Sequence, residues 1–307
     1  MRNVVVLLFL LSSTIFAQTD AASVLALTRY DVHPNIVYHT SNNFQDKLDV
    51  YTPRDTKQPT PVVVQIHGGG WIEGTKEEVA LELLPFMQLG YSAVNVEYRL
   101  GRASLAPAAV VDCRCALHWV FANAKKYNFD VNRVVLTGGS AGGHLALATG
   151  MLTPAAGFDR ECYVGSDDVW TREGGTGADP KVAAIVNFFG ITDVLDELHG
   201  PNTKGYAVVW VGDQPNADEV ARRVSPINMV SKDNPPIITI HGDRDELVPY
   251  SQAVRLRDSL TKAGVPNQLY TVKGGGHGGF SLQEETDIWA TIRQFLNQNI
   301  KAPVPAK

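Results

Sequence analysis

Short runs of apolar and β-branched residues alternate along the chain with longer stretches whose apolar residues recur at helical spacing. Val62–Ile66, which is apolar except for Gln65, is typical of a strand buried on both faces. This alternation predicts an α/β fold with a mainly parallel central sheet and helices on both of its faces. The predicted strands are Asn35–Thr40, Lys47–Tyr51, Val62–Ile66, Ser92–Val96, Arg133–Thr137, Lys181–Phe188, Ile237–Ile240 and Gln268–Val272, and the predicted helices are Lys76–Gln88, Ala108–Tyr127, Ala141–Gly150, Ser251–Ala263 and Glu284–Asn297.

Two stretches interrupt this rhythm. Thr153–Asp179 is polar and rich in glycine, and Leu195–Asp218 contains several turn residues. Long irregular stretches inside a compact domain are usually functional. We therefore interpret both as loop insertions over the active site of a single domain that spans residues 18–307.

The first residues have the pattern of a signal peptide. A basic residue, Arg2, precedes the apolar run Val4–Leu11, and a small residue, Ala17, follows shortly after. The apolar run is shorter than the roughly 20 residues that a membrane span needs, which disfavours the alternative of an uncleaved membrane anchor. We expect residues 1–17 to be removed and the protein to be secreted or periplasmic, without a stable membrane anchor.

Composition excludes several classes of protein. Of the 307 residues, 44% are hydrophobic and 19% are charged, so the chain is neither intrinsically disordered nor a basic nucleic-acid binder. The formal net charge of -5 likewise gives no attraction for polyanions, and we expect no nucleic-acid partner.

The three cysteines allow at most one internal disulfide. Cys113 and Cys115 lie two apart on a predicted helix and point in different directions, so they should not pair with each other. A bridge from one of them to Cys162 fits an oxidising compartment, and three buried free thiols are the alternative. The spacing shows no zinc site, and we expect no metal.

The strongest chemical signal is Gly138-Gly139-Ser140-Ala141-Gly142, between a predicted strand and a predicted helix. A Gly-x-Ser-x-Gly motif in this context indicates a nucleophile elbow, a sharp turn that holds a serine hydroxyl above the sheet. Glycines are required at both ends because a Cβ atom there would collide with the neighbouring strand or helix. The helix that begins after Ser140 favours the negative charge that develops during attack.

A glycine-rich loop, His67-Gly68-Gly69-Gly70-Trp71, follows the strand Val62–Ile66. Glycines allow backbone N–H groups to face a substrate oxygen. We predict an oxyanion hole formed by the N–H groups of Gly69, Gly70 and Ala141. His67 is expected to hold the loop in place by hydrogen bonds and to have no catalytic role.

Two further loops follow predicted strands. One carries three candidate carboxylates, Asp243, Asp245 and Glu246, and the other carries His277 among glycines. A carboxylate can orient a histidine, which in turn activates a serine. Ser140, one of these acids and His277 occur in the chain order of the α/β-hydrolase triad, and each follows a strand, where ligands bind in open parallel sheets.

From about residue 35 to residue 297, the chain resembles the α/β-hydrolase esterases. It is similar to the hormone-sensitive-lipase-like group in His67–Gly70, in Tyr98–Leu100 and in Pro107–Ala109 with Asp112. The resemblance implies an α/β-hydrolase fold and an esterase that needs no cofactor. The segment before Pro34 is short, which implies a reduced helical cap.

The segment His241–Pro249 looks more like that of bacterial carbohydrate esterases of the feruloyl and acetyl-xylan type. In those enzymes the second aspartate of His-Gly-Asp-x-Asp-x-x-Val-Pro is the triad acid. The resemblance therefore selects Asp245, whereas Asp243 and Glu246 do not match that position. Thr153–Asp179 has no counterpart in the simplest members, so it should alter the shape of the pocket.

Three aromatic residues are candidates for substrate binding. Trp71 follows the oxyanion glycines, and Tyr206 and Trp210 lie in the second irregular stretch, where they could stack on a sugar or phenolic ring. Burial in the core is the alternative for each. His144 is expected to pack beneath the elbow, and Asp112 is expected to be a structural partner in a hydrogen bond or ion pair.

These features together predict an exported serine carboxylic-ester hydrolase with the triad Ser140, Asp245 and His277. Its expected substrates are small-molecule or oligosaccharide esters with short-chain acyl or hydroxycinnamoyl groups, including those of plant polysaccharides. The alternatives are an arylformamidase-like or peptidase-like amide hydrolase with the same triad, and a non-catalytic binding protein.

Overall fold

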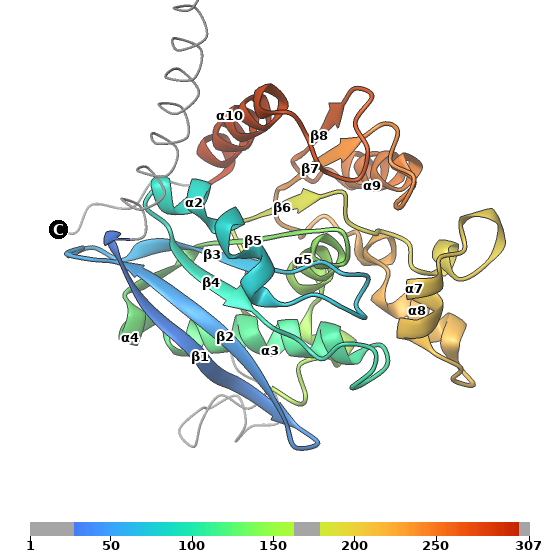
Figure 1. Ribbon diagram of the computed structural model, residues 1–307, viewed down its shortest axis with the longest axis horizontal. Helices are drawn as coiled ribbons and strands as arrows, with labels where there is room; N and C mark the ends of the chain where they lie inside the picture. The colour runs from blue at the N-terminus through green and yellow to red at the C-terminus, as the bar shows by residue number, and fades with distance from the viewer. Residues whose placement is uncertain (1–27, 163–178, 301–307) are drawn as a thin grey trace, which may run out of the picture.

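The computed structural model describes residues 28–162 and 179–300 and forms an eight-stranded sheet (Figure 1). The strand order is β1-β2-β4-β3-β5-β6-β7-β8; β1 and β2 are antiparallel to their neighbours, and the remaining pairs are parallel. The predicted signal peptide, residues 1–17, lies outside the described residues. The strands are β1 (Tyr30–Ser41), β2 (Phe44–Pro53), β3 (Thr60–Ile66), β4 (Ser92–Val96), β5 (Phe129–Gly139), β6 (Ala184–Phe188), β7 (Ile237–Gly242) and β8 (Asn267–Val272).

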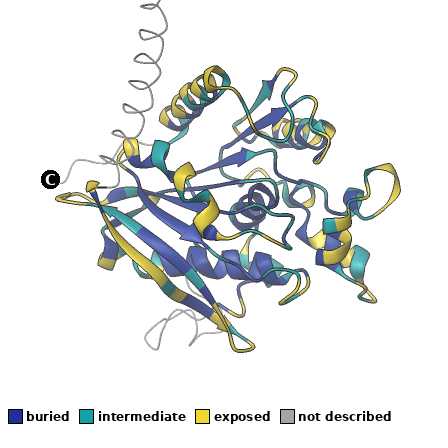
Figure 2. Ribbon diagram, viewed as in Figure 1, coloured by how far each residue is buried: buried dark blue, intermediate teal, exposed yellow. Residues whose placement is uncertain are grey.

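Helices cover both faces of the sheet, and each face has its own buried core. In β3, alternate residues enter different cores: Val62 and Val64 face one, and Val63 faces the other, as the two-residue period of a strand requires. Figure 2 shows the central strands buried and the outer faces of α9 and α10 exposed. The first core is covered by α3 (Ala108–Ala122), α5 (Ala141–Met151) and α9 (Tyr250–Ala263), and the second by η1 (Lys76–Leu83), α2 (Leu84–Gln88) and α10 (Leu282–Asn299).

The remaining helices are short. They include α7 and α8, which lie together at one end of the molecule (Figure 1). Among the described residues, no helix combines the length and apolarity needed to cross a membrane. The short helices are α4 (Ala124–Tyr127), η2 (Pro154–Ala156), η3 (Leu195–Glu197), η4 (Gly200–Asn202), α7 (Gly205–Val211), α8 (Ala217–Val224) and η5 (Pro226–Met229).

The predicted α/β architecture is confirmed, with corrections at particular elements. Lys76–Gln88, predicted as one helix, begins as the 3₁₀ helix η1 and becomes α-helical only at Leu84. Leu195–Asp218 is not wholly irregular, because it contains α7 and the start of α8. Helix α7 is rich in valine, which has low helix propensity, and the burial of Ala207 and Trp210 compensates for that. Of the other predicted insertion, residues 163–178 lie outside the described residues.

Close contact between β3 and α5 shapes the turn after β5. A Cβ atom on Gly138 would lie 2.5 Å from the carbonyl oxygen of Ile66, and one on Gly142 would lie 2.1 Å from the same oxygen. Both glycines are therefore required for strand and helix to approach. Between them, Ser140 has φ 57° and ψ -123°, a conformation that L-residues rarely adopt.

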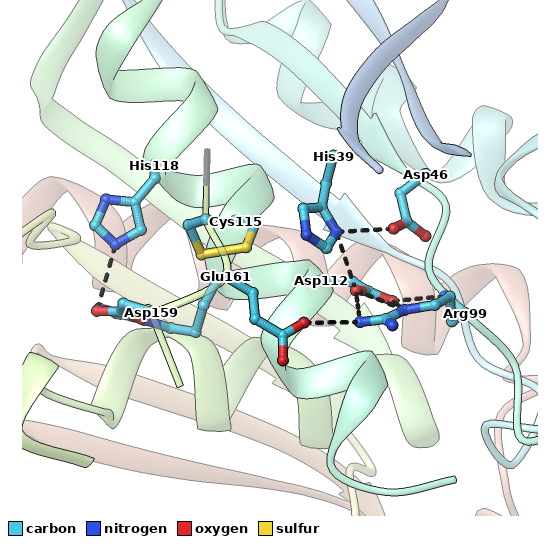
Figure 3. The surroundings of a disulfide bond; sticks show 10 residues. His39, Asp46, Arg99, Asp112, Cys115, His118, Asp159 and Glu161 are labelled. Carbon is cyan, nitrogen blue, oxygen red and sulfur yellow. Dashed lines mark hydrogen bonds and ion pairs between the residues drawn. A yellow bond between two sulfur atoms is a disulfide. The ribbon is translucent and has the colours of Figure 1, made fainter. Parts of the chain in front are cut away.

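A disulfide and a group of buried charges lie beside α3 (Figure 3). Cys115 is bonded to Cys162, and Cys113 is free and buried. Of the predicted alternatives, the structure thus has the bridge to Cys162, with Cys115 as its partner, and not three free thiols. The bond ties the chain after α5 to α3. Nearby, the Arg114 guanidinium donates hydrogen bonds to both carboxylate oxygens of Asp159.

The second charged group in Figure 3 joins the β1–β2 hairpin to α3. Arg99 donates to both carboxylate oxygens of Asp112, so Asp112 has the structural role expected for it. His39 Nδ1 lies 3.0 Å from Asp46 Oδ2 and 3.4 Å from Asp112 Oδ1. Burial opposes a charge on His39, but hydrogen bonds to Asp112 and Asp46 outweigh it and raise its pKa to about 9.

The contact at Gly142 predicts a stability effect. In Gly142→Ala, the added Cβ meets backbone oxygens of Ile66 and His67, which cannot rotate away. We expect the free energy of unfolding to fall by about 1–3 kcal/mol, measured by urea denaturation. Gly205→Ala is the matched control, because a Cβ there meets nothing within 4 Å. Equal stability of the two variants would show that β3 and α5 can separate at no cost.

The buried histidine predicts a pH effect. An unfolded histidine loses its proton near pH 6.5, whereas His39 keeps it until about pH 9. Between these values the folded state binds the extra proton, so the stability that His39 contributes is fully present below pH 6.5 and is lost as pH rises toward 9. In the wild type, the free energy of unfolding measured by urea titration should fall by up to about 3 kcal/mol between pH 6.5 and 9, and His39→Gln should remove this fall. A stability profile for His39→Gln identical to that of the wild type would contradict the assignment.

Candidate active site

The loops at the carboxyl ends of β3, β5, β6, β7 and β8 meet at one edge of the sheet. They border an open cavity of about 830 Å³. Ser140 comes from the turn after β5, and His277 comes from the loop after β8. The cavity is lined by His67, Gly68, Gly69, Gly70, Ile72, Glu73, Gly74, Glu78, Val79, Glu82, Gly139, Ser140, Phe189, Tyr206, Leu247 and His277.

His277 is oriented by Asp245. Its Nδ1 lies 2.7 Å from Asp245 Oδ2, whose side chain is completely buried. The other oxygen, Oδ1, accepts hydrogen bonds from the N–H groups of Leu247 at 2.8 Å and Val248 at 2.9 Å. Burial alone would raise the pKa of Asp245, but hydrogen bonds from His241, His277 and Val248 outweigh it and hold the pKa well below its usual range.

The ionised state of Asp245 fixes the tautomer of His277. A carboxylate can only accept hydrogen bonds, so Nδ1 of His277 must carry the proton that it donates. Its Nε2 is then unprotonated in the neutral ring and can act as a base. The His277 side chain is 17% exposed and lines the same cavity as Ser140.

The competing carboxylates have other partners. Asp243 Oδ1 accepts a hydrogen bond from the N–H of Gly274 at 2.7 Å, and its Oδ2 lies 3.3 Å from the ammonium group of Lys273. Glu246 is exposed and uses its backbone carbonyl to accept from Lys204. Of the three acids weighed from the sequence, it is thus Asp245 that contacts His277.

His241 is a contributor that sequence reasoning missed. It is fully buried, and its Nε2 lies 3.0 Å from the carbonyl oxygen of Val248 and 3.2 Å from Asp245 Oδ2. Both neighbours are acceptors, so Nε2 carries a proton and donates. His241 thereby holds Asp245 on the side away from His277. Its position as the first residue of His241–Pro249 was the available signal.

The glycine loop has the backbone that its sequence predicts. Gly69 and Gly70 have φ values of +103° and +57°, and a Cβ on Gly69 would lie 2.0 Å from the carbonyl oxygen of Glu73. Both glycines border the cavity, and Ala141 is the first residue of α5, where a helix leaves its N–H groups without intrahelical acceptors. The three N–H groups proposed for the oxyanion hole thus come from the two loops beside Ser140.

The side chain of His67 contacts the backbone of this loop and Tyr98. It is buried, its ring stacks on Tyr98 at 4.2 Å, and its Nδ1 lies 2.8 Å from the carbonyl oxygen of Gly68. The hydroxyl of Tyr98 donates to the carbonyl oxygen of His67 at 3.1 Å. These contacts match the structural role expected for His67.

The three aromatic candidates differ in whether they reach the cavity. Tyr206 lines the cavity, and its Cβ would lie 2.8 Å from a Cβ on Gly70. Trp71 and Trp210, in contrast, are both completely buried and stack on each other with ring centroids 4.2 Å apart. Because neither has exposed surface to offer a ligand, their assignment to substrate binding is corrected to core packing.

His144 explains part of that packing. It is fully buried at the elbow helix and accepts a hydrogen bond from the indole N–H of Trp71 at 3.1 Å. Its Nε2 donates to the carbonyl oxygen of Val224 at 2.7 Å, and burial lowers its pKa to about 4. His144 is therefore a neutral structural residue beneath the elbow, as expected.

Two clusters outside the cavity have metal-ligand chemistry. They are His39, Asp46 and Asp112, and His118, Asp159 and Cys162. In each, an arginine already donates hydrogen bonds to an aspartate, and Cys162 is oxidised in the disulfide. The positive charge that a cation would supply is thus provided by side chains.

Two similar proteins of known name are ester hydrolases by that name. Esterase LipC of Mycobacterium tuberculosis is 29% identical over 262 residues, which cover 82% of this chain and 62% of LipC. The probable carboxylic ester hydrolase LipM of the same organism is 32% identical over 222 residues, covering 70% of this chain and 48% of LipM. The chain thus spans about half to three-fifths of the length of these relatives.

Solved structures match over nearly their whole length. A truncated form of a carbohydrate esterase from gut microbiota superposes with a TM-score of 0.70 at 27% identity, covering 88% of this chain and 98% of that one. The propionate-bound esterase 2 of Thermogutta terrifontis gives a TM-score of 0.71 at 24% identity, over 91% and 97%. The latter similarity shows the shared fold alone, which is the α/β-hydrolase fold.

The model of one family, BD-FAE, matches residues 48–260, which run from β2 to α9. The matched range includes the glycine loop, the elbow with Ser140 and the buried carboxylate Asp245. This chain, an α/β-hydrolase whose relatives are named esterases, therefore belongs to the BD-FAE family.

Proposed function

We propose that this protein is a carboxylic-ester hydrolase with the triad Ser140, His277 and Asp245. The observation that carries the proposal is the 2.7 Å contact between Asp245 and His277 Nδ1, with His277 and Ser140 bordering one cavity. That contact leaves His277 Nε2 as the nitrogen that can act as a base. The named activities of the relatives support the choice of an ester bond.

In the proposed reaction, the Ser140 hydroxyl oxygen attacks the ester carbonyl carbon while His277 Nε2 accepts the hydroxyl proton. The imidazolium that forms is stabilised by the ionised Asp245. His277 then returns the proton to the leaving alcohol, and an acyl group remains on Ser140. Water, deprotonated by His277, attacks the carbonyl carbon of this acyl-enzyme; the bond to the Ser140 oxygen breaks, the carboxylic acid leaves, and His277 returns the proton to the Ser140 oxygen.

The negative charge of the tetrahedral intermediate needs donors that are already in place. The N–H groups of Gly69, Gly70 and Ala141 are proposed to supply them, each lowering the barrier by about 3 kcal/mol. The fixed backbone of the glycine loop supports this role, because rigid donors need no reorganisation as charge develops. No step requires a metal or an organic cofactor.

The open side of the cavity suits a sugar. Glu73 and Glu78 line it, and Tyr206 lines it next to Gly70. Hydroxyl groups and the apolar faces of a sugar ring could contact these groups. Together with the named carbohydrate esterase among the structural neighbours, this supports acetylated or hydroxycinnamoylated polysaccharide fragments as substrates.

Export is part of the same proposal. The Cys115–Cys162 disulfide is typical of an oxidising compartment, and the first 17 residues have the pattern of a signal peptide. A secreted or periplasmic enzyme would meet polymer fragments that do not enter the cell. No nucleic-acid partner or stable membrane anchor is included in the proposal.

Substitution of the nucleophile gives the first test. Ser140→Ala should lower kcat for methyl butyrate, methyl ferulate and acetylated xylan by at least about 10⁴-fold while the circular dichroism spectrum stays unchanged. Initial rates on this panel, with an anilide and a formamide of matched acyl groups, give the measurement. Retained ester hydrolysis in the variant would exclude Ser140, and serine-dependent cleavage of the amides alone would establish the amidase alternative.

The two neighbouring aspartates give the second test. Asp245→Asn should reduce kcat about 10⁴-fold, because the amide can hold His277 in the wrong tautomer. Asp243→Asn is the matched control: its side chain caps the Gly274 N–H instead, and we expect less than about a threefold change. Steady-state kinetics on methyl butyrate compare the two, and the reverse ranking would show that the acid is wrongly assigned.

A further inference from the structure

Glu197 is a carboxyl group inside the protein that the proposed reaction does not use. It is the last residue of η3, its side chain is 0% exposed, and it does not line the catalytic cavity. We propose that Glu197 is a positioning residue for the active site, which binds the hydroxyl of Tyr206 and thereby keeps the Tyr206 ring against the glycine loop. The inference rests on the esterase function proposed above and adds a buried residue to that site.

The backbone brings Glu197 and Tyr206 together. The carbonyl oxygen of Glu197 accepts a hydrogen bond from the N–H of Lys204 at 2.9 Å, and α7 begins at the next residue, Gly205. Tyr206 is the second residue of that helix. Their side chains interact electrostatically, and each affects the pKa of the other.

Tyr206 connects two loops of the active site. Its hydroxyl donates to the carbonyl oxygen of Leu247 at 3.4 Å, on the loop after β7 that also carries Asp245. A Cβ added to Gly70 would lie 2.8 Å from the Cβ of Tyr206, so the tyrosine packs directly on the glycine loop. Because Tyr206 also lines the cavity, a shift of its ring would change the cavity wall beside the proposed oxyanion donors.

The hydrogen bonds around Glu197 leave one of its oxygens without a partner. Oε1 accepts from the amide of Gln252 at 3.4 Å, and Gln252 is itself completely buried in α9. The carbonyl oxygen of this amide accepts from the N–H groups of Thr192 and Asp193, so its nitrogen is the end that faces Glu197. Oε2 has no hydrogen-bond partner in the described part of the chain. A buried polar atom of this kind is costly unless another group satisfies it.

The neighbouring charges do not neutralise Glu197. Asp193 and Asp196 are paired with the Arg255 guanidinium at 2.9 Å and 3.0 Å. The ammonium group of Lys204 donates to a backbone carbonyl oxygen of the loop after β7 at 2.8 Å. Among residues 28–162 and 179–300, Glu197 therefore forms no ion pair, and a charge on it would be buried without compensation.

Burial accordingly raises the pKa of Glu197 to about 8. The Tyr206 hydroxyl and the positive charge of Lys204 lower this pKa, but burial outweighs them. The negative charges of Asp196 and Asp193 add to the rise. Near pH 7 Glu197 is thus mainly a neutral carboxylic acid, which can donate a hydrogen bond as well as accept one.

The hydrogen of this neutral acid has an acceptor in Tyr206. A hydroxyl that donates to Leu247 still has lone pairs free, so the Tyr206 oxygen accepts from Glu197 while its own hydrogen stays on the Leu247 carbonyl oxygen. When Glu197 loses its proton to solvent, the carboxylate can only accept. The Tyr206 hydrogen then turns from Leu247 to Glu197, and the connection between Tyr206 and the loop of Asp245 is lost.

The pH profile of kcat/KM for methyl butyrate tests this role, because kcat/KM reports the ionisations of the free enzyme. In the wild type, kcat/KM should fall at least about fivefold between pH 7 and pH 9.5, with its midpoint near 8. The fall should be absent in Glu197→Gln, whose amide stays neutral, and in Tyr206→Phe, which has no hydroxyl to turn. Glu219→Gln, at an exposed position of α8, is the matched control and should keep the fall.

Variants compared at pH 7 separate the hydrogen bond from the space that Glu197 fills. Glu197→Leu has a side chain of similar size without polar atoms, and it should lower kcat/KM at least about fivefold. Glu197→Gln, which can still donate to Tyr206, should recover most of this loss. Adding Tyr206→Phe to Glu197→Leu should cost little more than either change alone, since both remove the same hydrogen bond.

Carbon-13 NMR of the glutamate carboxyl groups gives a measurement that needs no activity and no unstable variant. The signal of Glu197, identified by its absence from Glu197→Gln, should titrate near pH 8 in the wild type. Tyr206→Phe should move this midpoint to higher pH, because the hydroxyl that lowers the pKa of Glu197 is gone. A midpoint that Tyr206→Phe leaves unchanged would overturn the pairing, and so would an alkaline fall in kcat/KM that persists in Glu197→Gln.

The positioning role and the esterase function fail in different ways. Hydrolysis of methyl butyrate that Ser140→Ala abolishes establishes the esterase, whatever the pH profile shows. If that hydrolysis is present and every variant has the wild-type profile, the positioning role alone is wrong. If the wild type and Ser140→Ala hydrolyse the ester at the same rate, the esterase function is wrong and the positioning role is overturned with it.

Discussion

The close approach of β3 and α5 at Gly138 and Gly142 is the constraint on which the site depends. Any side chain at these glycines would meet the carbonyl oxygen of Ile66, so the strand and the helix can approach this closely only because both residues are glycine. This contact forces Ser140 into its strained conformation and brings the loop after Ile66 against the same turn. The nucleophile and the proposed oxyanion donors are thus placed by one packing requirement, and the strain at Ser140 is sustained by the surrounding core.

The acid and the base depend on a second, electrostatic arrangement. Asp245 is buried yet ionised, because backbone N–H groups and two histidines donate to it. Its charge in turn determines which nitrogen of His277 holds a proton. His241 shares the carboxylate from the buried side and has no free access to the cavity, so it positions the acid without competing for the substrate. The reactive geometry is therefore a consequence of burial as much as of residue identity.

The elements that carry chemistry could be predicted from the sequence because their signals are local. The strands before Ser140 and His277 are short apolar runs, and glycine marks each turn. Trp71 and Trp210 were misassigned because adjacency in sequence does not reveal that their rings stack in the core. Helix α7 was missed because its valines oppose a helix and only tertiary burial stabilises it. A second cavity, of about 410 Å³ and lined by Thr137 of β5, Phe188 of β6 and Trp289 of α10, could not be foreseen, since it is made by residues from several distant segments.

The position of the second cavity follows from the same sheet geometry that places the nucleophile. Residues of β5 alternate between the two faces, so Leu136 enters the α5 core while Thr137 faces α2 and α10. Glycine at position 139 continues this second face without a side chain and leaves space beside Ser140. A side chain larger than hydrogen there would meet Phe189, 3.2 Å from an added Cβ, and would narrow the passage. The glycine before Ser140 therefore leaves the turn open toward this second cavity, which meets the cavity that Ser140 lines at Gly139 and Phe189.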